Sequence, residues 1–415
     1  MSLSPSLFLT VIGGVIIFGF VAEVVFRRFG IAPVLPLILV GFLMAGVLRW
    51  VDPAMAAAFA PYFGAVAFAI ILFTGGITFN LGSLIRTSLI ATLYTVLVFT
   101  LSVVAVALFW KLFYGDWLAG VSVGIMLGGT SGAVVVPIVE RLKVSDYVKG
   151  IATLESVLTD VLVVVGFSVI LALASGNGGV NPGMRLLQAF GIGAGVGMVV
   201  GFLWLQALRF LSGTGLSFTT TLGVLLLTYG TVELMGGSGP FSSLVLGLVL
   251  SNARILRKVL REDILKNVNI YLDDFTRRVS EEVSFLVRTF FFLLLGLAVD
   301  PSVLSSPLVL LGIITVFVLL VAVRYPVTVL LKILLRQVSD RDARVLWSMM
   351  PRGLASAVVA FSLSSVFPSL SSVLVAYALG IIVLSVLFMT AGVFLFAGGE
   401  GPPKEESGTE EPQPT

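Results

Sequence analysis

The chain has 415 residues, of which 58% are hydrophobic and only 11% are charged. A soluble domain carries about 25% charged residues, so this composition excludes a soluble protein and predicts one that crosses a membrane many times. The net charge is +3 and there is no Cys or His, which excludes disulfides, thiolate metal sites and any histidine that titrates near neutral pH.

Apolar runs bounded by Pro, Gly or charge predict thirteen membrane spans. They lie near residues 6–26, 32–49, 60–80, 86–111, 117–140, 147–174, 185–210, 217–235, 239–253, 280–299, 304–331, 344–367 and 370–397. The first span follows no basic residue and is interpreted as a retained helix, not a signal peptide. The charged connection 254–279 is either an interfacial helix or a solvated loop. The tail 398–415 is rich in Gly, Pro and Glu and is predicted to be disordered.

The positions of the basic residues predict how the chain is oriented. If the N-terminus is outside, most of the 25 Lys and Arg residues fall in the inner loops and few in the outer loops. Cytoplasmic loops carry this excess of positive charge. We therefore expect a multi-pass protein of the cell membrane, with its N-terminus outside and its C-terminus in the cytoplasm.

Helix breakers interrupt two of the predicted spans. The fifth span contains LGGTSGAVVVP (127–137), and the twelfth contains SMMPRGLASAVV (348–359). Broken helices are tolerated in a bilayer only where the freed backbone is buried in protein or lines a cavity. The breaks hold equivalent positions in spans 1–6 and 8–13, so the pattern predicts two inverted repeats with two discontinuous helices that cross. The Gly-rich segment 72–80 is a third break or a close packing site.

The sixth span carries two carboxylates, Glu155 and Asp160. A charge at mid-bilayer costs about 2.5–3.5 kcal/mol, so each needs a partner or a purpose. Arg352, in the second break, needs a counter-charge, and we expect it to pair with Glu155. Asp160 then has no fixed cationic partner and can take a proton or a hard monovalent cation with Ser, Thr and carbonyl oxygens. The alternative is one structural network of Glu155, Asp160 and Arg352.

Four motifs, in their order and spacing, carry a resemblance: GGTSGAVVVP (128–137), ESVLTD (155–160), EEVSFLVRTFFFLLLGL (281–297) and PRGLASAVV (351–359). Together they resemble the monovalent cation:proton antiporters, in the NhaP-like branch with thirteen helices. The resemblance covers residues 1–397, the predicted transmembrane domain. It implies that Asp160 binds Na⁺ or H⁺, that Ser156 is a co-ligand, and that Glu155 and Arg352 form a structural pair. It also implies a homodimer, with spans 1–3 and 8–10 as scaffold and spans 4–6 and 11–13 as a moving core.

The chain departs from the family pattern where hydroxyls replace other side chains. Where the family commonly has Asn-Asp, this chain has Thr159-Asp160. Where the family has Thr-Asp-Pro in the first broken helix, this chain has Thr130-Ser131-Gly132. Phe-Glu-Gly-Gly of the third helix is Phe73-Thr74-Gly75-Gly76. We therefore expect hydroxyls of Thr130, Ser131, Thr159 and Thr74 around the ion. A single carboxylate favours one-for-one, electroneutral exchange. Fewer anionic ligands weaken the preference for a small ion, so K⁺ is a candidate substrate beside Na⁺ and Li⁺.

The expected protein is thus an all-α polytopic transporter that exchanges a monovalent cation for H⁺ by alternating access in the lipid bilayer. No enzyme activity, cofactor or nucleic-acid partner is expected. The alternative is a carrier of organic anions on the same architecture, which would use Arg352, Arg288 and the positive ends of half-helices. A passive channel lacks a pore-loop signature.

Overall fold

The computed structural model describes residues 5–29, 33–48, 50, 53–78, 89–174, 182–211, 217–252, 274–335 and 338–396. Every regular element in these ranges is helical. The helices are α1 (Pro5–Phe29), α2 (Val34–Phe42) with a π-helical end (Leu43–Val47), α3 (Pro53–Thr78), α5 (Leu89–Tyr114), α6 (Trp117–Gly128), α7 (Gly132–Arg141), α8 (Asp146–Ala174), α9 (Pro182–Leu211), α10 (Ser217–Leu234), α11 (Gly239–Ser251), α13 (Asp274–Leu297), α14 (Pro301–Leu304), α15 (Pro307–Leu334), α16 (Asp340–Ser348), α17 (Leu354–Val366), a 3₁₀ turn (Pro368–Leu370) and α18 (Ser371–Phe396).

A helix or a pair of half-helices lies at each predicted span. Six segments of the described chain are long and apolar enough to cross a membrane: Leu89–Tyr114, Trp117–Arg141, Asp146–Leu171, Leu187–Leu208, Pro307–Leu334 and Pro368–Phe396. The all-helical membrane class is therefore confirmed, whereas thirteen crossings stay a prediction. Residues 254–273 of the charged connection and the tail 398–415 lie outside the described residues, and 274–279 form the start of α13.

Helix ends follow local signals in the sequence. Pro53 and Pro307 stand at the first positions of α3 and α15, where a missing N–H costs nothing. Asp116 caps α6 by accepting hydrogen bonds from the backbone N–H groups of the second and third residues. Ser339 caps α16 in the same way. The starts of α6 and α16 are therefore defined by side-chain caps.

Two glycine crossings hold four helices at backbone contact distance. At one, Gly41 of α2 meets the backbone of α13, and Gly296 of α13 meets the backbone of α2. At the other, Gly76 of α3 and Gly247 of α11 meet in the same reciprocal way. A Cβ at any of the four would overlap the facing backbone, so only glycine permits these contacts. Residues 72–78 are thus a packing site inside a continuous helix and not a third break, and residues 79 and 80 of the predicted segment lie outside the described residues.

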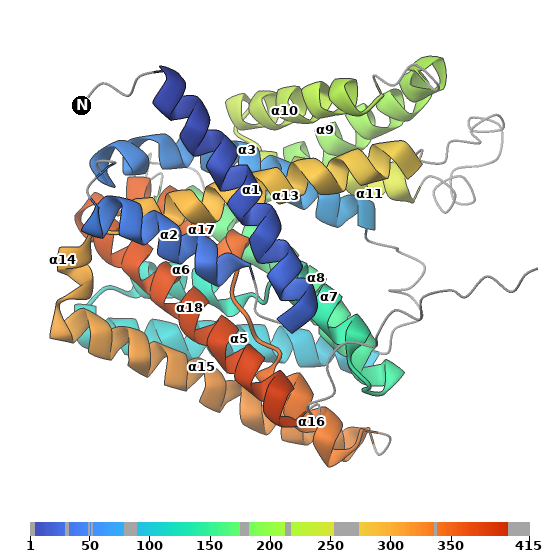
Figure 1. Ribbon diagram of the computed structural model, residues 1–415. Helices are drawn as coiled ribbons and strands as arrows, with labels where there is room; N and C mark the ends of the chain where they lie inside the picture. Colours follow the sequence, from blue (N-terminus) through green and yellow to red (C-terminus); the bar gives the residue numbers. More distant parts are fainter. Residues whose placement is uncertain are drawn as a thin grey trace, which may run out of the picture.

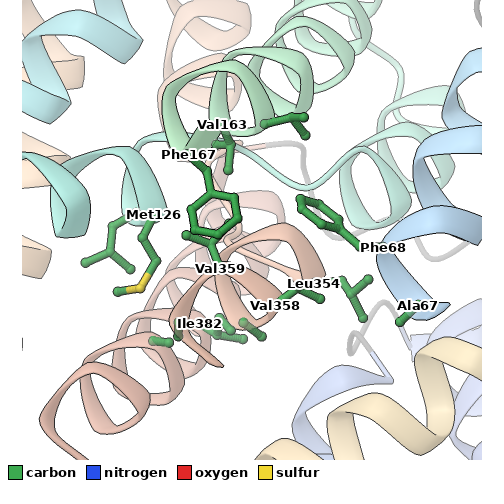
Figure 2. Close-up of a cluster of buried hydrophobic side chains, with 14 of the residues drawn as sticks. Ala67, Phe68, Met126, Val163, Phe167, Leu354, Val358, Val359 and Ile382 are labelled. Carbon is green, nitrogen blue, oxygen red and sulfur yellow. The ribbon is translucent and has the colours of Figure 1, made fainter. Parts of the chain in front are cut away.

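The helices are arranged so that the broken ones lie in the interior. In Figure 1, α9 and α10 lie at one side of the bundle, α15 and α5 lie at the opposite side, and α6 and α17 lie between them. A buried apolar cluster fills the space around the half-helices α6 and α17 (Figure 2). The members labelled in Figure 2 come from α3, α6, α8, α17 and α18: Ala67, Phe68, Met126, Val163, Phe167, Leu354, Val358, Val359 and Ile382.

Candidate functional site

Both predicted breaks are present, and they touch. In the first, α6 ends at Gly128 and α7 begins at Gly132, with extended backbone between them. In the second, α16 ends at Ser348 and α17 begins at Leu354. Glycines have poor helix propensity, and Pro351 disfavours helix for itself and for the residue before it. The N–H of Ser131 donates to the carbonyl of Pro351 at 2.8 Å, so the two unwound segments are bonded where they cross.

Hydroxyl groups of the next helix satisfy the backbone at each break. The N–H of Thr130 donates to the side-chain oxygen of Thr159 on α8 at 3.0 Å. The N–H of Arg352 donates to the hydroxyl of Ser385 on α18 at 2.8 Å. A buried N–H without an acceptor is costly, and lipid offers none. The helix after each break therefore supplies the acceptor that the missing helical turn cannot.

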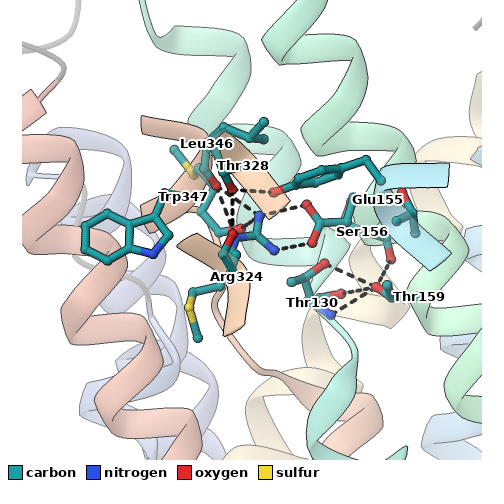
Figure 3. Close-up of polar contacts among 12 residues, drawn as sticks. Thr130, Glu155, Ser156, Thr159, Arg324, Thr328, Leu346 and Trp347 are labelled. Carbon is teal, nitrogen blue, oxygen red and sulfur yellow. Dashed lines mark hydrogen bonds and ion pairs between the residues drawn. The ribbon is translucent and has the colours of Figure 1, made fainter. Parts of the chain in front are cut away.

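Glu155 is paired with Arg324 of α15, so the predicted Glu155–Arg352 pair is wrong. Arg324 donates from Nη1 to Oε1 and from Nη2 to Oε2, the second bond at 2.7 Å (Figure 3). Both side chains are 1% exposed. Bidentate guanidinium–carboxylate bonds are among the strongest in proteins and suit a buried pair. With both its oxygens occupied by Arg324, Glu155 is not available as a direct partner of Arg352.

The remaining donors of Arg324 are also used. Nη2 donates to the carbonyls of Leu346 and Met349, both at 2.9 Å, and Nε donates to Leu346 at 3.3 Å. These carbonyls lie at and just beyond the end of α16, where a helix leaves its last acceptors without intrahelical donors. Arg324 therefore ties α15 to α8 and also closes the broken end of α16. The sequence signal was an arginine in the middle of the apolar run 304–331.

Arg352 is buried but has no carboxylate partner among the described residues. It is 1% exposed, and its Nε has no hydrogen-bond acceptor in the described part of the chain. Its Nη1 makes one long contact, 3.5 Å, with the carbonyl of Met350. The guanidinium stays protonated in proteins. Arg352 therefore adds a buried positive charge near the crossing, and Glu155 does not neutralise it because Glu155 is already paired with Arg324.

Asp160 lies beside the first break and faces Gly132. It is half-buried on the face of α8 that also carries Ser156, one turn earlier. Gly132, the first residue of α7, faces both: a Cβ there would stand 3.4 Å from Ser156 Oγ and 3.8 Å from Asp160 Oδ2. Within the described chain, the Asp160 carboxylate makes no hydrogen bond or ion pair. Its oxygens are available to a proton or a cation.

Three of the predicted co-ligands are linked to one another at the first break, and one of them, Ser156, faces Gly132 together with Asp160. The hydroxyls of Thr130 and Thr159 lie 3.1 Å apart, and Thr159 also donates to the carbonyl of Ser156 at 3.3 Å (Figure 3). The Ser156 hydroxyl donates to the carbonyl of Thr153, so its lone pairs stay free to contact a cation. Direct ion coordination by Thr130, Ser156 and Thr159 stays a prediction.

The other two predicted co-ligands are placed differently. Ser131 packs against Gly353, and a Cβ added at Gly353 would overlap the Ser131 side chain. Ser131 also borders a cavity. Thr74 bonds across to Ser284 of α13, with their hydroxyls 2.9 Å apart, and donates to the carbonyl of Ile70. No bond joins either side chain to Asp160 within the described residues. Their roles as ion ligands stay predictions.

Residues 13–397 match the family model described as sodium/hydrogen exchanger, transmembrane. The chain belongs to the sodium/hydrogen exchanger family. This membership confirms the resemblance seen in the motifs and makes the chain a member of a family of transporters.

The chain is similar to known proteins in sequence and in fold. It is 26% identical over 195 residues to sodium/hydrogen exchanger 7 of Arabidopsis thaliana, a match that covers 46% of this chain and 16% of that relative. Its fold is similar to that of the sodium proton antiporter MjNhaP1 from Methanocaldococcus jannaschii. In the structure at pH 8, the TM-score is 0.77 at 19% identity, covering 94% of this chain and 97% of that one. A second structure, from electron microscopy, gives 0.75 at 18% identity, covering 99% and 100%.

Proposed function

We propose that this exchanger moves a monovalent cation, Na⁺ in the first place, against H⁺ at Asp160. The observation that carries the proposal is the Asp160 carboxylate itself, without a hydrogen bond or ion pair in the described chain and facing a glycine, Gly132, at the first break. Family membership supports the same reaction. Because one carboxylate holds either a proton or a metal cation, the two ions compete, and competition at a site that faces each side in turn is sufficient for exchange.

The proposed stoichiometry is one cation for one proton. Glu155 is neutralised by Arg324, so Asp160 is the carboxylate at the crossing that is left to change its charge. A proton and a monovalent cation then give the loaded site the same total charge, and exchange is electroneutral. Li⁺ and K⁺ are proposed as further substrates, since the neighbouring ligands are hydroxyls and not additional carboxylates.

Alternating access is proposed through two inverted repeats. If spans 1–6 superpose on spans 8–13, the crossing of α2 with α13 exchanges with the crossing of α11 with α3, and both are glycine crossings. Thr159 and Ser385 then play equivalent roles after each break. In this arrangement α1–α3, α10, α11 and α13 form the scaffold of a homodimer in the cell membrane. The moving core consists of α5–α8 and α15–α18, with the N-terminus outside.

The buried Arg352 favours a second candidate, a carrier of organic anions, since its Nε has no acceptor in the described chain. One experiment separates the two. Purified protein in proteoliposomes is given Na⁺, Li⁺ or K⁺ pulses, with the membrane potential clamped, beside Asp160→Asn. Cation-dependent proton flux that Asp160→Asn abolishes supports exchange, and a KM for Na⁺ that rises as pH falls supports competition. No flux with any cation in folded protein would reject the exchanger and favour the anion carrier.

A further inference from the structure

A cavity of about 90 Å³ lies between helices α1, α2 and α13 on one side and the first break on the other. Ser131 and Ala133 border it from the break. Asp160 is not among the described residues of its wall, but it lies behind Gly132, the residue between those two. If an ion leaves Asp160 past Gly132, this cavity is the space that it reaches.

Two opposite charges border the same cavity, a carboxylate on α1 and a guanidinium on α13. Gly19 of α1 packs against Thr289 of α13, where a Cβ would lie 2.9 Å from the Thr289 hydroxyl. Glu23 is one helical turn beyond Gly19 and so lies on the face of α1 that meets α13. Arg288 precedes Thr289, and its Nε donates to the carbonyl of Ser284 at 3.3 Å. The cavity wall includes both Glu23 and Arg288.

We infer that Glu23 and Arg288 set the affinity for the transported cation on the cavity side alone. This inference rests on the proposed exchange at Asp160. A carboxylate on the wall of a low-dielectric cavity raises the local concentration of cations, and a guanidinium lowers it. Both residues belong to the proposed scaffold, whereas Asp160 belongs to the proposed core. When the core faces the opposite side, Glu23 and Arg288 no longer border the ion's path.

The two charges predict effects of opposite sign. Glu23→Gln removes a negative charge from the wall, and the KM for Na⁺ from the cavity side rises about three- to tenfold. Arg288→Gln removes a positive charge from the wall and lowers the same KM. Glu23→Asp keeps the charge and restores the normal value. The two KM changes shrink when an inert salt raises the ionic strength, because mobile ions screen the charges at the cavity mouth.

The test measures Na⁺-driven proton flux in proteoliposomes of uniform orientation, with Na⁺ supplied from one side and then from the other. The chain has no Cys, so Ala133→Cys labelled by an impermeant thiol reagent identifies the cavity side. Glu140→Gln is the matched control, because Glu140 is an exposed carboxylate near the end of α7 that does not border the cavity. The expected result is a KM change for Glu23→Gln and Arg288→Gln on the cavity side only, with kcat unchanged.

Three results would overturn the inference alone, given wild-type flux that Asp160→Asn abolishes. They are equal KM changes on both sides, no change on either side, and a rise in KM for Arg288→Gln like that for Glu23→Gln. The last would mark the two residues as a structural unit. Wild-type protein that shows no cation-dependent flux would overturn the proposed function, and the inference with it.

Discussion

Glu155 of α8 and Arg324 of α15 form a buried bidentate pair between residues 169 positions apart in the sequence. The same guanidinium closes the end of α16 through two backbone carbonyls. One side chain thus joins the helix that carries Asp160 to the second broken helix. The pair is structural, and it fixes the position from which Asp160 acts.

The first prediction concerns this pair. Glu155→Gln or Arg324→Gln leaves a buried charge unpaired and should lower the free energy of unfolding by about 3–5 kcal/mol. Arg324→Lys should also destabilise, because an ammonium cannot reproduce the bidentate contacts. Thermal unfolding in detergent measures the effect. Lys332→Gln, which breaks the exposed Lys332–Asp340 pair, is the control and should change little. A Glu155→Gln protein as stable as wild type would contradict the prediction.

The second prediction concerns the hydroxyl of Thr159. Thr159→Val removes the acceptor of the buried Thr130 N–H and should cost about 1–3 kcal/mol, whereas Thr159→Ser keeps the acceptor and should cost less. Unfolding is measured without transported cation, so a loss of ion binding cannot account for the difference. Equal stability of the Val and Ser variants would show that the break does not depend on this bond.

The third prediction concerns the space in front of Asp160. Gly132→Ala places a methyl group at the distance of ordinary contact with Asp160, so the protein should fold but hold the cation less well. The loss should be greatest for K⁺, the largest of the three ions, and smallest for Li⁺. KM values for the three cations measure it. Gly150→Ala, on the same helix as Asp160 and with nothing within 4 Å, is the control. Identical losses for Li⁺ and K⁺ would argue against a steric effect.

The fourth prediction compares neighbouring glycines of α3. Gly76→Ala forces a methyl group into the backbone of α11 and should destabilise by about 1–3 kcal/mol, the usual cost of overpacking. A Cβ at Gly75 meets nothing within 4 Å, so Gly75→Ala should be neutral. Melting temperature and the yield of folded protein distinguish the two. Matching values for both variants would mean that the crossing is not close-packed.

The sequence was sufficient for the helices and for the breaks. Long apolar runs and helix breakers act locally, so the ranges 127–137 and 348–359 could be located without any knowledge of packing. The ionic partner of Glu155 could not be identified in this way. Arg288, Arg324 and Arg352 all lie in apolar runs of the sequence, and which of them meets Glu155 depends on how helices far apart in the chain are placed together.

The candidate site was predicted in part for the same reason. Asp160 and Ser156 share a face of one helix, so periodicity alone places them together. The bond from Thr130 to Thr159 forms because the backbone at Thr130 is not helical and because α8 lies beside it, and the sequence alone does not give this second condition. The acceptor role of Ser385 was missed, since a serine in an apolar helix has no distinctive signal until the facing backbone is known.

At Gly353 the second break comes so close to Ser131 that no side chain larger than a hydrogen atom fits between them, and the backbones are bonded beside it. Neither half-helix can slide past the other without first separating from it. In the proposed alternating access, this contact keeps the spacing of the two breaks the same whichever way the site is turned. If the oxygen atoms at the breaks select the ion by size, we expect the same order of preference among Li⁺, Na⁺ and K⁺ on both faces of the membrane, even where the strength of binding differs.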